Sequence, residues 1–470
     1  SPTQARKLRV NLLQEVRLQV NLHPDIHYFF NCIPRSLLHL NLGLEVCVYL
    51  IVEDSAIVQK ILRHTLKQQC VEPVLFATSM AEGCALVEKH GDAIVSALVD
   101  ISLPDAPSGE MVEYVLEKNI PVVVLTGSSD GEQRQALLKQ GIADYVVKEN
   151  RFSYQYAVRM LQRLYLNRSI TALVVDDSAT MRQVVSCYLK LQCYQVIEAE
   201  NGQEAIDCLQ NDDNISLVIT DYNMPVMDGF QLVQEIRHRY EKRPISVIGL
   251  SSHDDSDVSV QFIKKGANDF LQKPFKQEEF CCRVTNNIEA LEQLKALREQ
   301  AERDYLTGLF NRRYFIEEGT QSVNQLISDG KAVSVALLDI DRFKQINDEY
   351  GHDAGDAVLR QFAVYLQDTF GRFLVARYGG EEFALILPGL GSDKAFGLLD
   401  GFRQYVAEQI FILQDDDYLR ATVSIGLSAP DIGQPSNLND MLQQADLALY
   451  AAKENGRNLL MSHDPESDQA

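Results

Sequence analysis

The apolar and polar positions of this chain form a pattern that repeats after about one domain length. A short apolar run that ends in acidic residues occurs at Val48–Val52 and again at Ala172–Val175. The acids that follow the two runs are Glu53, Asp54, Asp176 and Asp177. The second acidic pair lies 123 residues after the first, so the sequence predicts two successive domains of the same kind.

Each copy contains further apolar runs, and a reactive side chain stands at or near the end of each one. The runs alternate with stretches of helical amphipathic spacing, which indicates a parallel sheet covered by helices on both faces. The polar residues concerned are Asp100, Thr126 and Lys148 in the first copy and Asp221, Ser251 and Lys273 in the second. The carboxyl ends of parallel strands gather functional groups. We therefore expect each set to form one site, since a purely structural repeat would need only the apolar runs.

The segment that follows the second copy is charged and helical in spacing. Residues Arg283–Arg303 contain no Gly or Pro and include Ile288, Leu291, Leu294 and Leu297. The pattern predicts a helix that links the second copy to the last domain. Two interpretations stay open, a dimer seam or an amphipathic helix packed on its neighbour, because a coiled coil is recognised from three or four heptads.

A different pattern occupies the last third of the chain. The apolar run Val335–Leu338 leads directly into Asp339, and further on a Gly-Gly pair immediately precedes Glu381. Carboxylates at a strand end and in a tight hairpin can hold divalent cations that activate a hydroxyl and stabilise a phosphate. The glycines would permit close backbone approach to a ligand. Taken singly, each acid is also consistent with a solvated loop carboxylate.

Composition and charge narrow the classes of function. The 470 residues, 46% hydrophobic and 23% charged, are typical of about three globular domains. The formal net charge of −22 argues against nucleic acid as a partner, which requires a basic footprint. No apolar run is long enough for a membrane span and no secretory signal begins the chain, so we expect a cytoplasmic protein. The nine cysteines show no paired CxxC spacing, although Cys281 and Cys282 are adjacent, and reduced thiols are expected.

Residues 1–46 match neither repeat. They contain His23, His27 and His39, but Pro24 interrupts the helical spacing. An extension of unknown role, or one that docks a partner, is favoured over a metal site.

Both repeats resemble the receiver domains of response regulators. The resemblance covers about residues 47–290 and rests on the acids, the hydroxyl residue, the aromatic residue and the lysine, which occur in the same order in each copy. It implies a flavodoxin-like doubly wound fold and phosphorylation by a cognate histidine kinase or phosphotransfer protein. It also implies Mg²⁺ (or Mn²⁺) in each receiver. The implied phospho-acceptors are Asp100 and Asp221.

The resemblance gives a role to each matching residue of the two copies. The implied metal ligands are Glu53, Asp54 and Asp100 in the first copy and Asp176, Asp177 and Asp221 in the second. The implied switch residues are Thr126, Tyr145 and Lys148 in the first copy and Ser251, Phe270 and Lys273 in the second. The first copy departs modestly from the family, since Glu149 follows its lysine in place of proline. A silent adaptor role therefore stays open for the first copy.

The last domain resembles the GGDEF family of diguanylate cyclases. Its strongest motif, Arg377–Phe383, contains the GGEEF form of the signature. The other matching segments are Asp304–Leu309, Asp339–Lys344, Asn347–Asp348, Gly351–Asp356 and Ala452–Asn458. The resemblance implies a palm-like α+β domain that joins two GTP into cyclic di-GMP and releases pyrophosphate. The implied cofactor is Mg²⁺ (or Mn²⁺).

This second resemblance also implies individual roles. The metal ligands would be Asp339, Glu381 and the Ile340 carbonyl, and the catalytic set would be Glu381, Asp339, Lys344 and, as a weaker candidate, Glu382. The substrate-binding set would be Phe343, Asn347, His352, Asp356, Gly379, Gly380, Lys453 and Arg457. Within that set Asn347 and Asp356 would read guanine, because a carboxylate accepts from both N1–H and the 2-amino group.

One feature of many family members is absent. The positions of the inhibitory Arg-x-x-Asp product site are Phe370 and Phe373 in this chain, so we expect weak or no product inhibition. Because each such domain binds one GTP, the resemblance implies a homodimer, formed when receiver phosphorylation changes receiver packing. Two rival interpretations are a catalytically silent nucleotide-binding module and a receiver-based signalling scaffold.

These patterns together predict a fold of the α/β and α+β multidomain class. Two flavodoxin-like doubly wound domains would precede a palm-like domain of the nucleotide-cyclase type. The predicted boundaries are 1–46 for the extension, 47–168 and 169–282 for the receivers, 283–303 for the helical linker, 304–463 for the cyclase domain and 464–470 for a tail.

Overall fold

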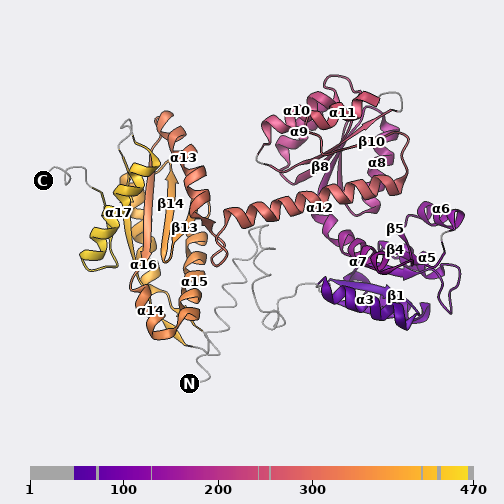
Figure 1. Cartoon of the computed structure of the whole chain (residues 1–470), viewed down its shortest axis with the longest axis horizontal. Coiled ribbons are helices and arrows are strands. Elements are labelled where there is room, and N and C mark those ends of the chain that lie inside the picture. The colour runs from indigo at the N-terminus through magenta and orange to yellow at the C-terminus, as the bar shows by residue number, and fades with distance from the viewer. Residues whose placement is uncertain are drawn as a thin grey trace. The chain divides into compact units, whose positions relative to one another are not determined.

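The computed structural model describes residues 47–463, apart from 70–72, 129, 242, 253–255, 414–416 and 431–435. The expectations for residues 1–46, including the three histidines, and for the tail at 464–470 lie outside the described residues. The chain divides into two compact units, one ending at Asn287 and the other beginning at Ile288. Figure 1 shows the elements of both units along the chain. Among the described helices, none combines the length and the hydropathy that a bilayer span requires.

The first repeat forms a five-stranded parallel sheet with the strand order β2-β1-β3-β4-β5. The strands are β1 (Val48–Val52), β2 (Val74–Ala77), β3 (Ile94–Asp100), β4 (Val122–Thr126) and β5 (Asp144–Val147). The helices are α3 (Ala56–Gln68), α4 (Met80–His90), η3 (Gly91–Ala93), α5 (Glu110–Glu117), α6 (Gly131–Gln140) and α7 (Arg151–Leu166). Strands β1, β3 and β4 are buried along their whole length, which explains their continuous apolar runs.

The strands of this sheet supply two cores at once. Leu50 and Val52 pack in the core that includes α4 and α5, whereas Tyr49 and Ile51 pack in the core that includes α3 and α7. Successive side chains of a strand point to opposite faces, so both faces of the sheet need a cover of helices. The acids that follow β1 and end β3 are thereby left at the carboxyl edge of the sheet.

The second repeat has the same topology. Its sheet has the order β10-β9-β8-β6-β7, which from the opposite edge is the order of the first repeat. The strands are β6 (Thr171–Val175), β7 (Gln195–Ala199), β8 (Ile215–Asp221), β9 (Ser246–Ser251) and β10 (Asp269–Gln272). The helices are η4 (Asn167–Ser169), α8 (Ala179–Leu191), α9 (Gly202–Asn211), α10 (Gly229–Arg239) and α11 (Ser256–Lys264). The doubly wound fold predicted for both repeats is confirmed.

Helix α12 (Gln277–Glu302) begins six residues before the predicted start of the linker. The prediction placed the start where the charged composition begins, but Phe280 is already buried and belongs to the same helix. Further along, Ile288 and Leu291 are buried, whereas Leu294 is 45% exposed and Leu297 is 63% exposed. The last helix of the second repeat and the predicted linker are therefore one continuous helix.

The last domain is built on a six-stranded sheet with the order β11-β13-β14-β12-β17-β18. Its strands are β11 (Phe310–Asn311), β12 (Val333–Ile340), β13 (Leu374–Gly379), β14 (Glu382–Pro388), β17 (Val423–Ser428) and β18 (Leu460–Ser462). Its helices are α13 (Arg312–Ser328), α14 (Phe343–Tyr350), α15 (His352–Phe370), α16 (Ser392–Glu408) and α17 (Leu438–Glu454). Two short strands, β15 (Phe411–Ile412) and β16 (Tyr418–Leu419), form a separate hairpin. Central strand β12 is antiparallel to both neighbours, as expected of an α+β domain.

Helices cover both faces of this sheet. Helices α13 and α17 pack on the face that carries Val335 and Leu337, and α14, α15 and α16 pack on the face that carries Ala336 and Leu338. The backbone of α17 lies directly against β17 at Gly426. A Cβ at this glycine would stand 2.0 Å from the Ala445 carbonyl oxygen, so a side chain would push the helix away. The close packing fixes where the end of α17 reaches the sheet.

Candidate active site and receiver sites

The acids of the last domain meet at one edge of its sheet. Asp339, near the end of β12, stands directly opposite Glu382 on β14 and opposite Ser424 on β17. Directly opposite residues of an antiparallel pair project to the same face. Glu381 lies in the turn between β13 and β14, and its carbonyl accepts a hydrogen bond of 3.4 Å from the Ile340 N–H. Strand register therefore gathers the predicted carboxylates.

The charge around Asp339 is only partly balanced. Its carboxylate is buried and lies 2.7 Å from the Nζ of Lys453, which stands near the end of α17. Burial raises the pKa of Asp339 to about 6, the carboxylates of Glu381 and Glu382 add to this effect, and Lys453 opposes it. Among the described residues, the oxygens of Asp339, Glu381 and Glu382 do not form a group as close as that of Glu53, Asp54 and Asp100. Carboxylates that repel one another are nevertheless stabilised by an added cation, and hard oxygen ligands are those that Mg²⁺ prefers. The residues present thus fit a divalent metal site.

The start of α14 is suited to an anion. The helix begins at Phe343 after Arg342, whose φ of 56° is left-handed and whose side chain makes no capping hydrogen bond. The first N–H groups of a helix lack partners within the helix and point toward its N-terminus. Lys344 is exposed in this first turn. Backbone and side-chain donors for a phosphate therefore occur together, shortly after strand β12.

The predicted guanine readers lie on two helices that pack closely. Asn347 belongs to α14, and His352 and Asp356 belong to α15. A Cβ at Gly355 would stand 1.9 Å from Oδ1 of Asn347, so this glycine permits the contact between the two helices. Asn347 and Asp356 are half-buried, whereas His352 is exposed. Position 355 is therefore a glycine because a larger residue would occupy the space that the Asn347 side chain fills.

The hairpin that carries Glu381 is held by an arginine that the sequence had not singled out. The Nε of Arg377 donates to the Gly380 carbonyl at 2.9 Å, and its Nη1 lies 3.1 Å from Oδ1 of Asp304. The same Asp304 oxygen accepts from the Thr307 N–H and hydroxyl. Burial acts to raise the pKa of Asp304, but Thr307 and Arg377 outweigh burial and hold that pKa below its ordinary value. Asp304 and Arg377 both lie in segments that match the GGDEF family, and this match was the signal for them in the sequence.

The two remaining cations lie at the end of α17. Arg457 is exposed and adopts a left-handed φ of 64° in the turn that follows the helix. Its Nη1 donates to the Lys453 carbonyl at 3.3 Å. The structure therefore brings Lys453 to Asp339 and places Arg457 in the adjoining turn.

In the first repeat the lysine bridges two acids. The Nζ of Lys148 lies 2.7 Å from Oε2 of Glu53 and 2.6 Å from Oδ2 of Asp100. Glu53, Asp54 and Asp100 each offer one oxygen, and these oxygens lie within 4.8 Å of one another. Burial raises the pKa of Glu53, an effect that Lys148 opposes. Three carboxylates this close together fit a divalent cation by their donor chemistry.

The second repeat shows the same lysine bridge. The Nζ of Lys273 lies 2.7 Å from Asp176 and 2.6 Å from Asp221. Burial raises the pKa of Asp221, and the hydrogen bond from Lys273 opposes that rise. Within the part of the chain that the structure describes, the oxygens of Asp176, Asp177 and Asp221 do not form a group as close as that of the first repeat.

The hydroxyl and aromatic residues of the first repeat share one carbonyl. Thr126 lies at the end of β4, and its hydroxyl donates to the Ser128 carbonyl at 3.4 Å and accepts from the Ser128 N–H at 3.1 Å. Tyr145 is buried, and its hydroxyl donates to the Ser128 carbonyl at 3.0 Å. In the second repeat Ser251 is buried at the end of β9, and Phe270 packs 5.9 Å from the Phe262 ring. Thr126 and Ser251 each end the strand that pairs with the one ending in Asp100 or Asp221.

The positions of the missing product site are structural. Phe370 is fully buried and its ring lies 5.1 Å from that of Phe402. Phe373 is partly buried against the same core. Neither position offers a charged group to a ligand.

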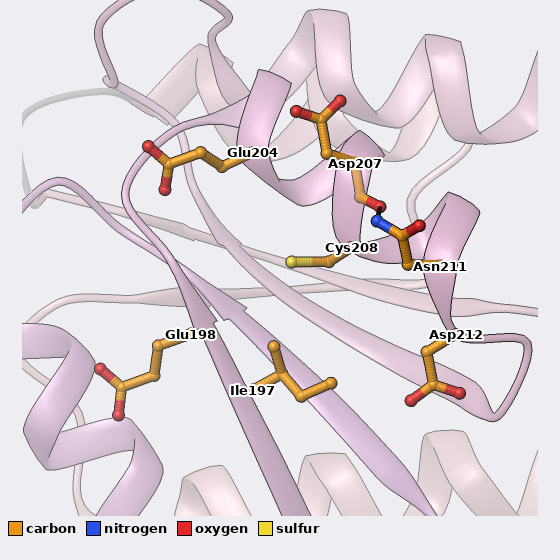
Figure 2. A pocket seen from close by; sticks show the side chains of 7 residues that line it. All are labelled: Ile197, Glu198, Glu204, Asp207, Cys208, Asn211 and Asp212. Atoms are coloured by element: carbon orange, nitrogen blue, oxygen red, sulfur yellow. Dashed lines mark hydrogen bonds between the residues drawn. The ribbon is translucent and has the colours of Figure 1, made fainter.

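A cavity of about 350 Å³ lies on the second repeat. Figure 2 shows acidic side chains around Ile197 and Cys208, between edge strand β7 and helix α9. The acids are Glu198, Glu204, Asp207 and Asp212. Glu198 accepts from the Ser186 hydroxyl at 2.7 Å, and Glu204 accepts from the Glu200 N–H at 2.9 Å. None of the predicted site residues lines this cavity.

Comparison with known proteins assigns the domains. The receiver domain family of response regulators matches residues 49–154 and 172–285, and the family described as diguanylate cyclase, GGDEF domain, matches residues 301–459. A solved two-component system response regulator/GGDEF domain protein is 44% identical, with a TM-score of 0.50, over 52% of this chain and 99% of that chain. The chain is a response regulator of the GGDEF diguanylate cyclase family.

The similarity of this response regulator to one curated relative extends over most of its length. It is 29% identical to the response regulator PleD of Caulobacter vibrioides over 452 residues, which cover 88% of this chain and 98% of that protein. The protein YhcK of Bacillus subtilis is 41% identical over 169 residues, 35% of this chain and 46% of that protein. Two receivers followed by a diguanylate cyclase domain are thus confirmed as the organisation of the chain.

Proposed function

We propose that this diguanylate cyclase condenses two GTP into cyclic di-GMP and two pyrophosphates, under the control of its receivers. The observation that carries the proposal is the arrangement at the end of β12. Asp339 and Glu382 stand opposite each other in register, and Lys453 contacts Asp339 from α17. Such a group of acids next to phosphate-binding donors supports phosphoryl chemistry on a nucleotide.

Each part of the substrate has a partner among the residues of this site. Asp339, Glu381 and the Ile340 carbonyl would hold Mg²⁺ (or Mn²⁺), which lowers the pKa of the attacking 3′-hydroxyl and stabilises charge on the α-phosphate. Lys344, Lys453 and Arg457, with the backbone at Phe343, bind the triphosphate, because cations and N–H donors offset its charge. Asn347 and Asp356 bind the guanine edge. His352, Gly379 and Gly380 line the nucleotide, and Glu382 supports the acidic cluster.

Two copies of the chain take part in each turnover. One catalytic domain carries one such set of residues, so the second GTP is bound by a second copy. Leu294 and Leu297 on α12 are exposed large apolar side chains, and in a dimer they would be covered. The homodimer seam is therefore proposed to include this part of α12.

The receivers would set whether the dimer forms. Asp100 and Asp221 accept a phosphoryl group from a histidine kinase or phosphotransfer protein, with Mg²⁺ held by the neighbouring acids. Lys148 and Lys273 already contact these carboxylates and would pair with the added charge. Thr126 and Ser251 contact the phosphoryl group, and Tyr145 and Phe270 reorient with the state of the site.

The test is the product formed from GTP and Mg²⁺, separated by chromatography. Wild type should form cyclic di-GMP, and Glu381→Ala should lose nearly all of this activity. Glu408→Ala is the matched control, because it removes an exposed carboxylate at the end of α16. If phosphorylated wild-type dimer leaves GTP unchanged, the proposed function is wrong.

A further inference from the structure

The second acid of the Asp339-Ile340-Asp341 segment has a different environment from the first. Residues two apart in a strand direction project to the same face, so the sequence alone allows Asp341 to be another metal ligand. In the structure Asp341 is 6% exposed, and both of its carboxylate oxygens accept hydrogen bonds. The donors are the Ser424 hydroxyl to Oδ1 at 2.6 Å, the Thr422 hydroxyl to Oδ2 at 2.6 Å and the Asn458 N–H to Oδ2 at 2.9 Å. A buried carboxylate with three neutral donors is a structural anchor.

The third of these donors belongs to the turn that carries a phosphate-binding cation. Arg457 and Asn458 are consecutive and have φ angles of 64° and 48°, which L-residues rarely adopt. Such a turn persists when surrounding contacts hold it. Asp341 holds the Asn458 N–H, and Arg403 Nη1 holds the Asn458 carbonyl and side-chain oxygens, each at 3.0 Å. The turn is therefore fixed from the metal-binding strand on one side and from α16 on the other.

The same acid also fixes the strand side of the site. The Asp341 N–H donates to the Thr422 carbonyl at 2.9 Å, and its carboxylate binds the Thr422 and Ser424 hydroxyls. Ser424 stands opposite Asp339 in the sheet. One side chain thus connects the strand of the metal ligands, strand β17 and the turn of Arg457.

We propose that Asp341 is a positioning residue that keeps the Arg457 turn in register with Asp339, and that it is not a metal ligand. The inference rests on the proposed function, since it assigns Arg457 to the triphosphate. Its consequence is that loss of the Asp341 charge weakens nucleotide binding through Arg457 while the metal requirement stays as it is.

The experiment compares the full-length Asp341→Asn, Arg457→Ala and double variants with wild type. The affinity for 3′-deoxy-GTP, which lacks the attacking hydroxyl, is measured by calorimetry. The KM for GTP and the Mg²⁺ concentration that gives half-maximal rate are measured from the rate of GTP turnover. Asp341→Asn should weaken binding about tenfold, as expected for one lost charge-assisted hydrogen bond, and leave the Mg²⁺ midpoint unchanged. The double variant should bind no more weakly than Arg457→Ala, because coupled residues are not additive.

Other results would overturn the proposal. If Asp341→Asn needs more Mg²⁺ than wild type for half-maximal rate, Asp341 is a metal ligand. If the loss of 3′-deoxy-GTP affinity in the double variant equals the product of the losses in the two single variants, Asp341 does not act through Arg457. Should Asp341→Asn fail to fold, Thr422→Val removes one donor and leaves the acid, and it should shift 3′-deoxy-GTP binding in the same direction by a smaller factor. Unchanged binding in Thr422→Val would then contradict the proposal. If wild type binds 3′-deoxy-GTP but forms no cyclic di-GMP from GTP, this result contradicts the proposed function and leaves the role of Asp341 in nucleotide binding unaffected.

Discussion

Lys453 and Asp339 form an ion pair of 2.7 Å between the end of α17 and the end of β12. The pair connects a helix of one face to the central strand, although 114 residues separate the two positions in the sequence. The close approach of α17 to β17 at Gly426 makes the contact possible. The pair also places a cation where a triphosphate would meet the acidic cluster.

Removal of this cation should weaken substrate binding. We expect Lys453→Ala to raise the KM for GTP by roughly 10- to 100-fold, since a hydrogen bond to a charged group contributes about 1.5–3 kcal/mol. Steady-state kinetics with GTP and Mg²⁺ measures the change. Lys394→Ala, which removes an exposed lysine from α16, is the control and should leave the KM as in wild type. Equal kinetics of the two variants would contradict the role of Lys453.

The space beside Asn347 should be sensitive to a single methyl group. In Gly355→Ala the new Cβ would stand 1.9 Å from Oδ1 of Asn347, so the amide must move. We expect a loss of about 1–3 kcal/mol of stability from overpacking, with a raised KM for GTP.

Gly397→Ala is the matched control for this change. Gly397 also lies inside a helix, α16, and a Cβ there would have no atom within 4 Å. This variant should be neutral or stabilising by up to about 1 kcal/mol. Thermal unfolding compares the stabilities of Gly355→Ala and Gly397→Ala, and steady-state kinetics compares their KM values for GTP. A stable Gly355→Ala protein with normal KM would show that Asn347 does not depend on this space.

The link between Asp304 and Arg377 predicts a pH dependence of stability. The pKa of Asp304 in the folded chain lies below its ordinary value. A group with a lowered folded pKa contributes stability above its unfolded pKa of about 4 and loses it as pH falls through the folded pKa. Asp304→Asn should therefore cost at most about 1 kcal/mol near neutral pH, or roughly 2–4 °C in the transition of the catalytic unit, and nothing in strong acid.

Calorimetry of wild type and Asp304→Asn between neutral pH and about pH 3 would measure this difference. Asp393→Asn, an exposed acid in the first turn of α16, serves as the control. A gap between wild type and Asp304→Asn that widens as the pH falls would be the wrong sign for the prediction.

The two receivers should respond separately to a phosphoryl donor. Lys148 contacts Asp100 at 2.6 Å and Lys273 contacts Asp221 at 2.6 Å, so each site has a cation ready for the added charge. Asp100→Asn and Asp221→Asn should each reduce the rise in cyclic di-GMP formation that a small-molecule phosphoryl donor produces, and the double variant should abolish that rise.

Asp92→Asn and Asp213→Asn are suitable controls, since both acids are exposed and precede the strands that end in Asp100 and Asp221. If only Asp221→Asn has an effect, the first receiver is a silent adaptor. If neither substitution changes activation, phosphorylation of the receivers does not control the enzyme.

Product should not inhibit the enzyme through the Arg-x-x-Asp position. Phe370 is fully buried and Phe373 is partly buried, so neither can bind guanine or phosphate of cyclic di-GMP. Initial rates of GTP turnover should stay constant when cyclic di-GMP is added. Phe370→Arg should not create the site but should destabilise the domain by several kcal/mol, because it buries an unpaired charge. Strong noncompetitive inhibition of wild type would show a product site elsewhere.

Local patterns were sufficient for the elements and for most of the candidate residues. The buried parallel strands gave continuous apolar runs, as β1 and β3 show, and the acids at their ends marked the edge at which the candidate residues stand. The boundary of α12 was less well predicted. Its first turn contains Glu278 and Glu279 beside the buried Phe280. Composition alone does not distinguish the last helix of a domain from a linker helix.

Local periodicity and motifs in a fixed order were enough to predict the order of the domains, the doubly wound and α+β fold classes, and the candidate acids and cations. The contacts of each candidate could be read from the folded chain alone. It separated Asp339, which faces Lys453, from Asp341, which anchors the turn at Asn458. The physical reason is that strand register and helix packing bring together residues far apart in the chain, and no local pattern records those distances.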